Sequence, residues 1–407
     1  MPHGHYEDVC VEGHLIDSGI MSAIMDVVVA LDGEFETLSF DVGRTNEDPS
    51  RAVLRVRGND TEHLDSLLTA VQEHGAVPVD PADVHLEPSP RDGVLPDGFY
   101  STTNLDTAVR LGGKWIPVEG TEMDLGIRVD QQAGRAWTVP MAEARAGEEF
   151  VVGHDGLRVK PQERPRDKQA FEFMTSAVSS EKPKAQVVHE VARILREVRD
   201  EGRTAIAVAG PAVVHTGAAD ELARIVRAGY IDVLFGGNAI AVHDIESALY
   251  GTSLGVSLSD GIPAVGGHEH HLRAINTIRR CGSIPDAVEQ GVLTSGLMHT
   301  LVETGTPFVL AGSVRDDGPL PDVITDVMEA QSAMRTYCRD AGACLMLSSM
   351  LHSIATGNML PASAQAICVD INPAVVTKLS DRGSWQTIGI VTDVGLFMEQ
   401  LANELET

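Results

Sequence analysis

From Thr204 to the C-terminus, short apolar runs alternate with stretches that have the periodicity of amphipathic helices. A strand that is apolar at every residue must be covered on both faces, which is typical of a parallel sheet flanked by helices. The alternation therefore predicts a doubly wound parallel sheet. The expected strands are Ala205–Ala209, Val233–Phe235, Phe308–Ala311, Ala343–Leu347, Ile367–Asp370 and Ile388–Val391.

Helical patterns occupy the intervals between these strands. A sheet built in this way is Rossmann-like, and it binds ligands where the carboxyl ends of its strands meet. The stretch Gly251–Thr306 is too long for one strand and one helix, and we expect it to be an insertion over that edge. The expected helices are Ala218–Arg227, Ala239–Leu249, Asp322–Tyr337, Ala374–Leu379 and Val394–Leu405.

The N-terminal part has a different order of elements. Between residues 6 and 80 the pattern is strand, helix, strand, strand, helix, strand, with helices at Ser18–Leu31 and Thr61–Glu73. The simplest assembly of this order is a ferredoxin-like α+β unit. From residue 88 to residue 165, glycine and proline separate short alternating runs, which predicts a small β-rich unit.

The whole chain is therefore expected to be an α/β protein. A C-terminal Rossmann-like doubly wound parallel sheet is preceded by the ferredoxin-like α+β unit and the small β-rich unit. The predicted domains are residues 1–90, 91–165 and 166–407.

The charge balance limits the partners. Acidic residues outnumber basic ones by 59 to 31, and the formal net charge at pH 7 is −28. Phosphate backbones are bound by concentrated positive charge, so this composition argues against a nucleic-acid partner. It fits a cationic small-molecule substrate or a salt-rich cytosol. It equally fits an acidic surface adapted for solubility, which says nothing about activity.

Cysteine usage and hydropathy indicate the compartment. The five cysteines are scattered and form no C-x-x-C pair. Cys344 and Cys368 lie in apolar strand-like runs, where a thiol behaves as a small hydrophobic side chain. This usage predicts reduced thiols and a cytoplasmic location. No stretch approaches the roughly 18 apolar residues of a membrane span, so we expect a soluble protein without a membrane partner.

Two loops at the predicted carboxyl edge resemble ligand-binding turns. In Gly210–Gly217, Pro211 and Ala212 replace the second glycine of the G-x-G-x-x-G fingerprint, so this loop alone is a weak signal for a dinucleotide. The later loop has paired glycines followed by Asn238, which offers a donor and an acceptor at a helix start. Asn238 could contact a ligand or serve only as a helix cap.

Acidic side chains follow two later strands. Asp370 ends one apolar run, and Asp393 follows the next. A carboxylate at such a position can accept hydrogen bonds from both hydroxyls of an adenosine ribose. In the alternative, Asn372 caps the next helix and Asp370 is merely solvated. Asp393 could cap the last helix, contact a cofactor, or do both.

Histidines near the predicted edge are candidates for proton transfer. His243 and Glu246 stand three residues apart on one helical face, and His352 follows the strand Ala343–Leu347. His352 could instead be a core or capping histidine. In the run His268–His271, ligands on adjacent residues would not converge on one ion, so no metal site is predicted.

The segment after Phe308–Ala311 is charged. Arg315 could bind the carboxylate of a substrate, and Asp316 could move protons together with a histidine. In the alternative, Asp316 and Asp317 cap the helix that is expected to begin near Asp322.

Several blocks together resemble one family. They are Gly13–Gly19, Phe99–Asn104, Gly113–Val118, Ala209–Ala219, His243–Gly255 and Ala311–Asp326. The chain resembles the archaeal-type ornithine cyclodeaminase family, whose N-terminal part was labelled a lysine-oxoglutarate reductase/saccharopine dehydrogenase (LOR/SDH) conserved region. It is similar over essentially its whole length to the C-terminal half of cyanobacterial arginine dihydrolase fusions. The amidine-hydrolysing domain is outside the resemblance, so arginine dihydrolase activity is not implied.

The resemblance implies a lyase that converts L-ornithine to L-proline and ammonia with tightly held NAD. Hydride leaves the α-carbon, the δ-amine attacks the resulting imine, ammonia departs and the hydride returns, so there is no net redox change. The implied cofactor contacts are Asn238, Ala239, Asp317, Ser349, Met350, Leu351, His352, Asp370, Asp393 and Val394.

Given that activity, we hypothesise that Asp316, His243 or His352 moves protons. Acidic residues would receive the cationic δ-amine of the substrate. The candidates for binding the substrate carboxylate are Arg315, Lys114 and Arg273.

Two other functions are open. One is an NAD(P)-dependent amino-acid dehydrogenase of the opine or saccharopine type, with net redox. The other is an amino-acid-sensing regulatory protein, because β-α-β-β-α-β units serve as small ligand-binding modules. In each case the ligand is a small amino acid, and we expect the chain to form a homo-oligomer.

Overall fold

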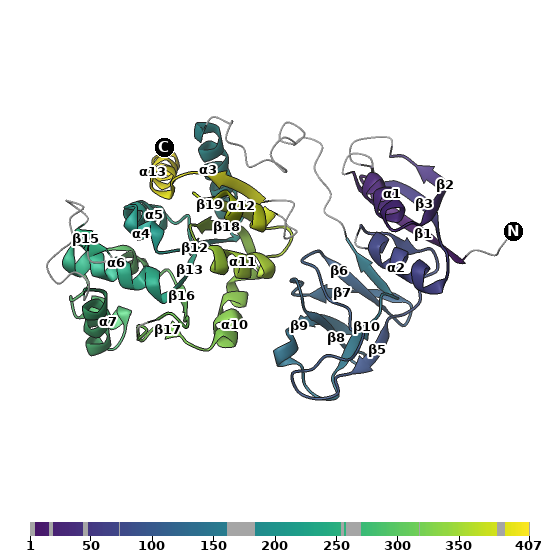
Figure 1. The fold of residues 1–407 in the computed structure, drawn as a ribbon, viewed down its shortest axis with the longest axis horizontal. Coiled ribbons are helices and arrows are strands. Elements are labelled where there is room, and N and C mark those ends of the chain that lie inside the picture. The colour runs from purple at the N-terminus through teal and green to yellow at the C-terminus, as the bar shows by residue number, and fades with distance from the viewer. Residues whose placement is uncertain are drawn as a thin grey trace. The chain divides into compact units, whose positions relative to one another are not determined.

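The computed structural model describes residues 5–15, 19–43, 48–72, 74–160, 184–253, 256–257, 270–316, 318–380 and 387–406. The chain divides into two compact units, Met1–Glu172 and Phe173–Thr407, which run from purple to blue and from teal to yellow in Figure 1. Each unit has its own hydrophobic core.

The first unit begins with an antiparallel sheet and two helices. The strands lie in the order β2-β3-β1-β4, which is the ferredoxin-like arrangement that the sequence predicted. Both helices present an apolar face to the sheet, where Ile24, Leu54 and Leu67 are fully buried. The elements are β1 (His5–Gly13), α1 (Ile20–Ala30), β2 (Glu34–Asp41), β3 (Ser50–Gly58), α2 (Thr61–Gln72) and β4 (Val77–Pro78).

A second sheet completes the first unit. Its strands lie in the order β11-β6-β7-β9-β8-β10-β5, so the expected β-rich part is present. Its first strand, β5, precedes the boundary expected at residue 90, and the division into three domains stays a prediction. The elements are β5 (His85–Pro88), β6 (Thr107–Leu111), β7 (Lys114–Glu119), β8 (Gly126–Asp130), β9 (Arg135–Val139), η1 (Met141–Glu143), β10 (Glu149–Val152) and β11 (Leu157–Val159).

The second unit contains the parallel sheet, in the order β17-β16-β13-β12-β18-β19-β20. All six strands expected from the apolar runs are confirmed, and the chain order reverses between β12 and β18. The strands are β12 (Thr204–Ala209), β13 (Val233–Gly237), β16 (Phe308–Ala311), β17 (Val323–Ile324), β18 (Ala341–Leu347), β19 (Gln365–Asp370) and β20 (Thr387–Val391), and a separate pair is β14 (Thr252–Ser253) and β15 (Val256–Ser257).

Helices cover both faces of this sheet, as a doubly wound fold requires. On one face the core includes side chains of α3 (Lys184–Asp200), α4 (Ala212–His215), α5 (Ala218–Arg227), α6 (Asn238–Tyr250), α7 (His270–Cys281), α8 (Ile284–Glu289), α9 (Leu297–Thr304) and α13 (Val394–Glu406). On the other face it includes side chains of α10 (Val327–Cys338), α11 (Met350–Met359) and α12 (Pro373–Ser380).

The inserted stretch before β16 does not lie over the edge as expected, as far as the structure describes it. Ile278, Ala287 and Leu301, from α7, α8 and α9, are fully buried in the core on one face of the sheet. Each of these helices is amphipathic and buries its apolar side chains there, so α7–α9 thicken the helical layer. His268 and Glu269 lie outside the described residues.

The helix expected at Asp322–Tyr337 also differs. Val323 and Ile324 pair with β16 as the short strand β17, and α10 begins only at Val327. The Asp326 carboxylate caps it by accepting hydrogen bonds from the backbone N–H groups of Met328 and Glu329. The residues expected to form the first turn of the helix pair with β16 instead. No local sequence pattern indicates this pairing.

All five cysteines are free thiols, and Cys344 and Cys368 are buried in β18 and β19 as expected. Burial raises the pKa of both thiols, that of Cys368 to about 12. Among the described residues, no helix is long and apolar enough to cross a membrane.

Candidate active site

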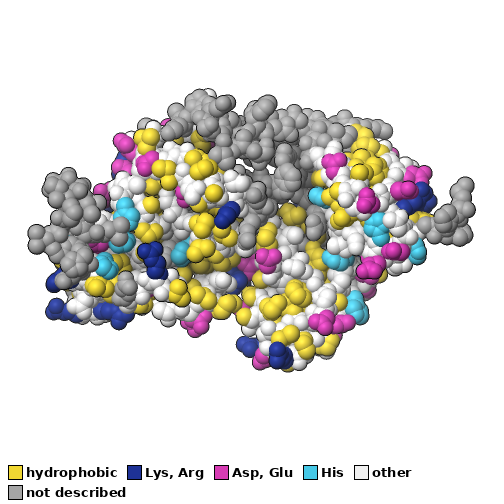
Figure 2. Space-filling model, viewed as in Figure 1, with side chains coloured by type: hydrophobic (Ala, Val, Ile, Leu, Met, Phe, Trp, Pro, Cys, Tyr) yellow, Lys and Arg dark blue, Asp and Glu magenta, His cyan; other side chains and the backbone are white. Residues whose placement is uncertain are grey.

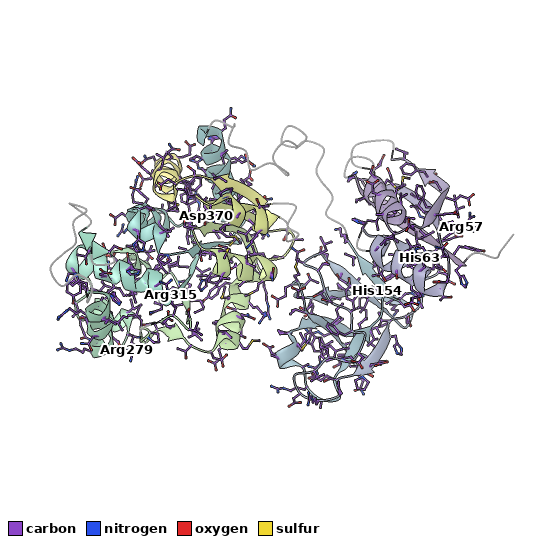
Figure 3. The ribbon with its side chains drawn as sticks, in the orientation of Figure 1. Arg57, His63, His154, Arg279, Arg315 and Asp370 are labelled. Carbon is purple, nitrogen blue, oxygen red and sulfur yellow. The ribbon has the colours of Figure 1, made fainter. Side chains whose placement is uncertain are left out.

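The carboxyl ends of the parallel strands meet at one edge of the sheet, and most predicted site residues follow these ends. Figure 3 labels two of them, Asp370 after β19 and Arg315 after β16. The predicted residues at this edge are Asn238, Ala239, Arg315, Asp316, Ser349, Met350, Leu351, His352, Asp370, Asp393 and Val394.

Two other candidates, Lys114 and Arg273, lie elsewhere. Lys114 is exposed at the start of β7 in the first unit, and Arg273 is exposed on α7. Asp317 lies outside the described residues. The site roles of these three residues stay predictions.

The first turn at this edge, after β12, is shaped by contact with the chain itself. A Cβ at Gly210 would lie 2.1 Å from the backbone oxygen of Ser348, and the Gly210 N–H donates to Leu347 O at 2.9 Å. Glycine is needed here because the loops after β12 and β18 touch. The short helix α4 follows directly, in place of a glycine-rich phosphate turn.

The turn after β18 leads into a longer helix, α11, whose start could hold an anion. Ser349 precedes α11, no side chain caps this helix, and its first turn contains no acidic residue. The N–H groups at the start of a helix carry partial positive charge and can hold a phosphate. The side chains of Met350 and Leu351, in that turn, are 39% and 74% exposed.

Asn238 starts α6 but does not cap it, since the cap position is Gly237. The side chain of Asn238 is buried, and its Oδ1 accepts a hydrogen bond from the Leu320 N–H at 3.0 Å. Its amide nitrogen makes no hydrogen bond with any residue that the structure describes. The capping alternative is wrong for this residue, and its ligand role stays a prediction.

The loop from β16 to β17 is held in place from several sides. Arg279 on α7, labelled in Figure 3, donates from Nε and Nη2 to Pro319 O at 3.0 and 2.6 Å. Asp322 Oδ2 accepts from the Ile284 N–H at 2.8 Å, and burial raises the pKa of this carboxyl group. With Asn238 bound to Leu320, the loop has anchors on α6, α7 and α8.

The same loop presents charged groups at the edge. Asp316 Oδ2 accepts from the Ser313 N–H at 2.8 Å, which closes a tight turn, and Arg315 at its tip is exposed. The alternative that Asp316 caps the following helix is wrong, because Asp326 does so.

His352 lies against the turn after β13. A Cβ at Gly237 would lie 3.2 Å from His352 Cε1, so the glycine leaves room for the ring. Burial lowers the pKa of His352, and the Asp316 carboxylate partly opposes this effect. Burial therefore favours the neutral form of the His352 imidazole.

Asp370 is 9% exposed, so the alternative of a merely solvated side chain is wrong. Its Oδ1 accepts from the Asn372 N–H at 2.8 Å, whereas its Oδ2 has no hydrogen bond to a described residue. Asn372 caps α12 through Ala374, as the alternative proposed, and Asp393 caps α13 through the Leu396 N–H at 3.0 Å.

Sequence reasoning missed Ile371. Its apolar side chain follows Asp370 and is 72% exposed, which suits a flat ring. An apolar residue directly after an acidic strand end was the available signal.

The juxtaposition of His243 with Glu246 is confirmed, with His243 Nδ1 3.0 Å from Glu246 Oε2. The structure adds His215, which the sequence did not mark: its ring centroid lies 4.9 Å from that of His243. No trio of residues in the described part of the chain is arranged to hold a metal ion.

These features define a protein whose C-terminal unit is a Rossmann-fold ligand-binding domain. Residues 189–401 match the family model described as the C-terminal Rossmann-fold region of ArgZ-like arginine dihydrolases. Residues 106–188 match the first region of the same C-terminal part, and residues 6–105 match the LOR/SDH bifunctional enzyme conserved region.

Full-length relatives are more specific. The ornithine cyclodeaminase of Methanopyrus kandleri is 53% identical over 98% of this chain and 97% of its own. The chain also aligns over 99% of its length with crystal structures of cyanobacterial ArgZ without ligand (40% identity, TM-score 0.85) and of AgrE in ternary complex with ornithine and NAD+ (44%, 0.54). It spans 58% and 57% of those two longer chains. The chain belongs to the ornithine cyclodeaminase family.

Proposed function

We propose that this chain is an ornithine cyclodeaminase, which converts L-ornithine to L-proline and ammonia and keeps NAD bound between turnovers. One observation carries the proposal. The uncapped N-terminus of α11 and the Asp370 carboxylate both lie at the carboxyl edge of the parallel sheet. The first suits a pyrophosphate and the second suits the hydroxyls of a ribose. The relatives' names and the AgrE complex supply the reaction and the ligands.

The residues at the edge fit NAD. The dinucleotide needs an anion site, an acceptor for a ribose, and apolar surface beside its rings. The start of α11 and Asp370 Oδ2 meet the first two needs, and the exposed side chains of Leu351 and Ile371 meet the third. The further residues that we propose to hold NAD are Asn238, Ala239, Asp317, Ser349, Met350, His352, Asp393 and Val394.

The chemistry that NAD supplies when bound is removal of the α-hydride of ornithine and its return after ring closure. The chain itself must hold the substrate folded, so that the δ-nitrogen reaches the α-carbon. We propose Arg315 for binding the substrate carboxylate, because it lies exposed at the tip of an anchored loop, with Lys114 and Arg273 as alternatives. His352, Asp316 and His243 are the candidates for moving protons between the amines.

Mass spectrometry of the purified protein under native conditions tests for resident NAD, and an assay with ornithine and no added cofactor tests the reaction. We expect equimolar proline and ammonia with an unchanged balance of NAD and NADH. Stoichiometric NADH without proline would instead identify a dehydrogenase with net redox. Amino-acid binding without any turnover would identify a sensor.

We further propose that the protein is cytoplasmic and forms a homo-oligomer. Five free thiols are stable in a reducing compartment, which supports the location. The edge strand β2 exposes Leu38 and Phe40 by 42% and 38%, and apolar edge strands are usually covered by another chain or element. Fractionation of cells tests the location. Light scattering tests the assembly, and a mass equal to that of one 43.4 kDa chain would contradict it.

A further inference from the structure

A chain of imidazole and carboxylate groups runs along α6. His243 Nδ1 lies 3.0 Å from Glu246 Oε2, and Glu246 Oε1 accepts a hydrogen bond from Thr252 Oγ1 at 2.9 Å. Thr252 Oγ1 in turn lies 2.8 Å from His270 Nδ1. Side chains of α6, of the adjoining β14 and of the more distant α7 thus share one polar network.

At the His243 end of this network lies a further imidazole, that of His215. The His215 ring packs edge to face on the His243 ring, and His215 Nδ1 lies 2.5 Å from Ser253 Oγ. His215 and His243 come from the connections that follow β12 and β13, two adjacent strands at the candidate active site. Figure 2 shows histidine atoms at the surface in the region of α4 and α6.

The Glu246 carboxylate is buried and would be unstable there without hydrogen-bond donors. The Glu246 side chain is 0% exposed and that of His243 is 12% exposed. A buried carboxylate is stable in a protein only when hydrogen bonds or opposite charge satisfy it. The network supplies Glu246 with a hydroxyl donor from Thr252 and an imidazole donor from His243.

Donor and acceptor chemistry assigns a proton to one nitrogen of each imidazole. Thr252 gives its only proton to Glu246, so His270 Nδ1 donates to Thr252. An ionised carboxylate only accepts, so the His243 Nδ1 carries a proton, and Nε2 is the atom that can take up a further proton. Within the described ranges, neither the His243 Nε2 nor the His215 Nε2 has a hydrogen bond.

We infer that His243 is the catalytic base that accepts protons from the substrate amines, and that Glu246 is the positioning residue that holds its ring and tautomer. This inference rests on the proposed function and deepens it. A carboxylate behind an imidazole serves the same purpose in other enzymes that use histidine as a base. Neither of the other candidates has such support: a backbone N–H holds Asp316, and the described residues give the His352 ring no hydrogen bond.

The protons of the reaction balance when His243 acts as the base. Both ammonium groups of ornithine must lose a proton, the α-ammonium before the hydride leaves and the δ-ammonium before the ring closes. His243 Nε2 takes the first proton and passes it to water. It then takes the second proton and gives it to the departing ammonia, while the ring nitrogen of proline takes up a proton from water. One ornithine cation therefore yields one proline zwitterion and one ammonium ion, and His243 ends each cycle unchanged.

The surroundings favour the neutral form of His215, the ring that packs on His243. Burial lowers the pKa of His215, and the nearby His243 lowers it further, whereas Glu246 opposes both effects. The described titratable groups that face His243 are His215 from α4, Glu246 from its own helix, and His270 from α7 through Thr252. A neutral His215 adds no charge beside the base.

The test compares variants of the full chain. His243→Gln should lower kcat for ornithine by about 100-fold or more, the range of a lost general base, while native mass spectrometry still finds NAD bound. Glu246→Gln keeps the shape of the side chain but removes the charge beside the imidazolium. It should lower kcat about tenfold and move the acidic limb of the kcat/KM profile to lower pH.

The chain offers a matched control. His299 and Glu303 form a looser pair on α9, with Nδ1 and Oε2 3.9 Å apart. His299→Gln and Glu303→Gln should leave kcat, KM and the pH profile as in the wild type. If the Glu246 variant does not fold, nitrogen NMR of wild-type imidazoles gives a second measurement, in which His243 should carry its proton on Nδ1.

The outcomes separate the two proposals. A wild-type protein that does not turn over ornithine contradicts the proposed function and removes the basis of this inference. With an active wild type, a His243→Gln variant that keeps more than about a third of kcat overturns the inference alone. A proton on His243 Nε2, or an unshifted profile for a folded Glu246→Gln variant, overturns it as well.

Discussion

Asn238 Oδ1 accepts a hydrogen bond from the Leu320 N–H at 3.0 Å, and this bond ties the start of α6 to the loop that presents Arg315 and Asp316. Because Oδ1 is used in this way, the amide nitrogen of Asn238 is the atom left to contact a cofactor. One buried side chain thus joins the loop to the proposed NAD site.

The two halves of the Asn238 amide can be tested separately. Asn238→Ala leaves the buried Leu320 N–H without its acceptor and should lower the free energy of unfolding by about 1–3 kcal/mol, measured in urea. Asn238→Asp keeps an acceptor but loses the amide donor, so stability should change less while retention of NAD falls. Wild-type retention of NAD by a folded Asn238→Asp protein would show that the amide nitrogen does not contact the cofactor.

Asp370 should matter for the cofactor more than for the fold. Asp370→Asn removes the charge from the free Oδ2, and affinity for NAD should fall by about 10–100-fold, as expected for hydrogen bonds to a charged group. Calorimetry on protein stripped of NAD measures the change. Asn372→Ala is the control, because Asn372 only caps α12: it should cost about 0.5–2 kcal/mol of stability and leave NAD affinity intact. Equal NAD affinity for both variants would argue against the ribose contact.

Arg279 should fix the loop that it holds through Pro319 O. In Arg279→Gln the loop loses its charged double hydrogen bond and opens more often, so trypsin should cut after Arg315 several times faster and KM for ornithine should rise. Cleavage is followed by mass spectrometry. The comparison is Arg280→Gln, which removes an exposed neighbouring charge on α7. The same rate of cleavage in both variants would show that Arg279 does not restrain the loop.

Two glycines on either side of α4 should respond differently to alanine. A Cβ at Gly210 meets the Ser348 oxygen at 2.1 Å, so Gly210→Ala should cost about 1–3 kcal/mol and displace the turn that leads into α11. Gly217 has φ of +78° but open space around it, so Gly217→Ala should cost about 1–2 kcal/mol and spare NAD binding. Thermal unfolding and native mass spectrometry give both readouts. Loss of NAD in both variants alike would contradict the special role of Gly210.

The buried carboxyl group of Asp244 should make the stability of the protein depend on pH. It is buried and accepts the N–H groups of Leu297 and Met298 at the start of α9, and burial raises its pKa from 3.8 to about 6. A carboxyl whose pKa is higher in the folded state binds more protons when folded, so its contribution to stability falls as pH rises through this range.

Urea unfolding from pH 4 to pH 7 checks this dependence. The stability advantage of wild type over Asp244→Asn should shrink across the window by up to about 3 kcal/mol, at roughly 1.4 kcal/mol per unit of pKa shift. The same substitution at the exposed Asp65 on α2 is the control for removal of a carboxylate. An advantage that grows with pH would reverse the sign and refute the assignment.

The strands were predictable because their signal is local. Buried parallel strands must be apolar at every residue, so β12 and β18 are visible in sequence as continuous runs. The first turn of the helix expected at Asp322 was not predictable, because its residues were compatible with a helix and pairing with β16 decided otherwise. The placement of α7–α9 was missed for a similar reason: their apolar faces are visible, but the surface that covers them is not.

Some features of the candidate active site were likewise predictable from the sequence, and others were not. The sequence by itself determined which side chains follow the ends of the parallel strands, because strand order and direction bring these ends to one edge. It therefore placed Asp370, Asn238 and His352 at that edge. It could not determine that Gly210 serves contact with Ser348, or that Oδ1 of Asn238 is used by Leu320, because each depends on a segment about 80 residues or more away.

The sequence thus determined the doubly wound sheet, the ferredoxin-like unit and the candidates at the carboxyl edge, since periodicity and turn residues are local properties. Only the tertiary structure decided which of those candidates have free polar atoms. It also decided that the end of β18 leads into the ten-residue helix α11, whereas the end of β12 leads into the four-residue helix α4, and that His215 packs on His243. Hydrogen-bond donors and acceptors are shared between distant segments, so their availability is known only once the chain has folded.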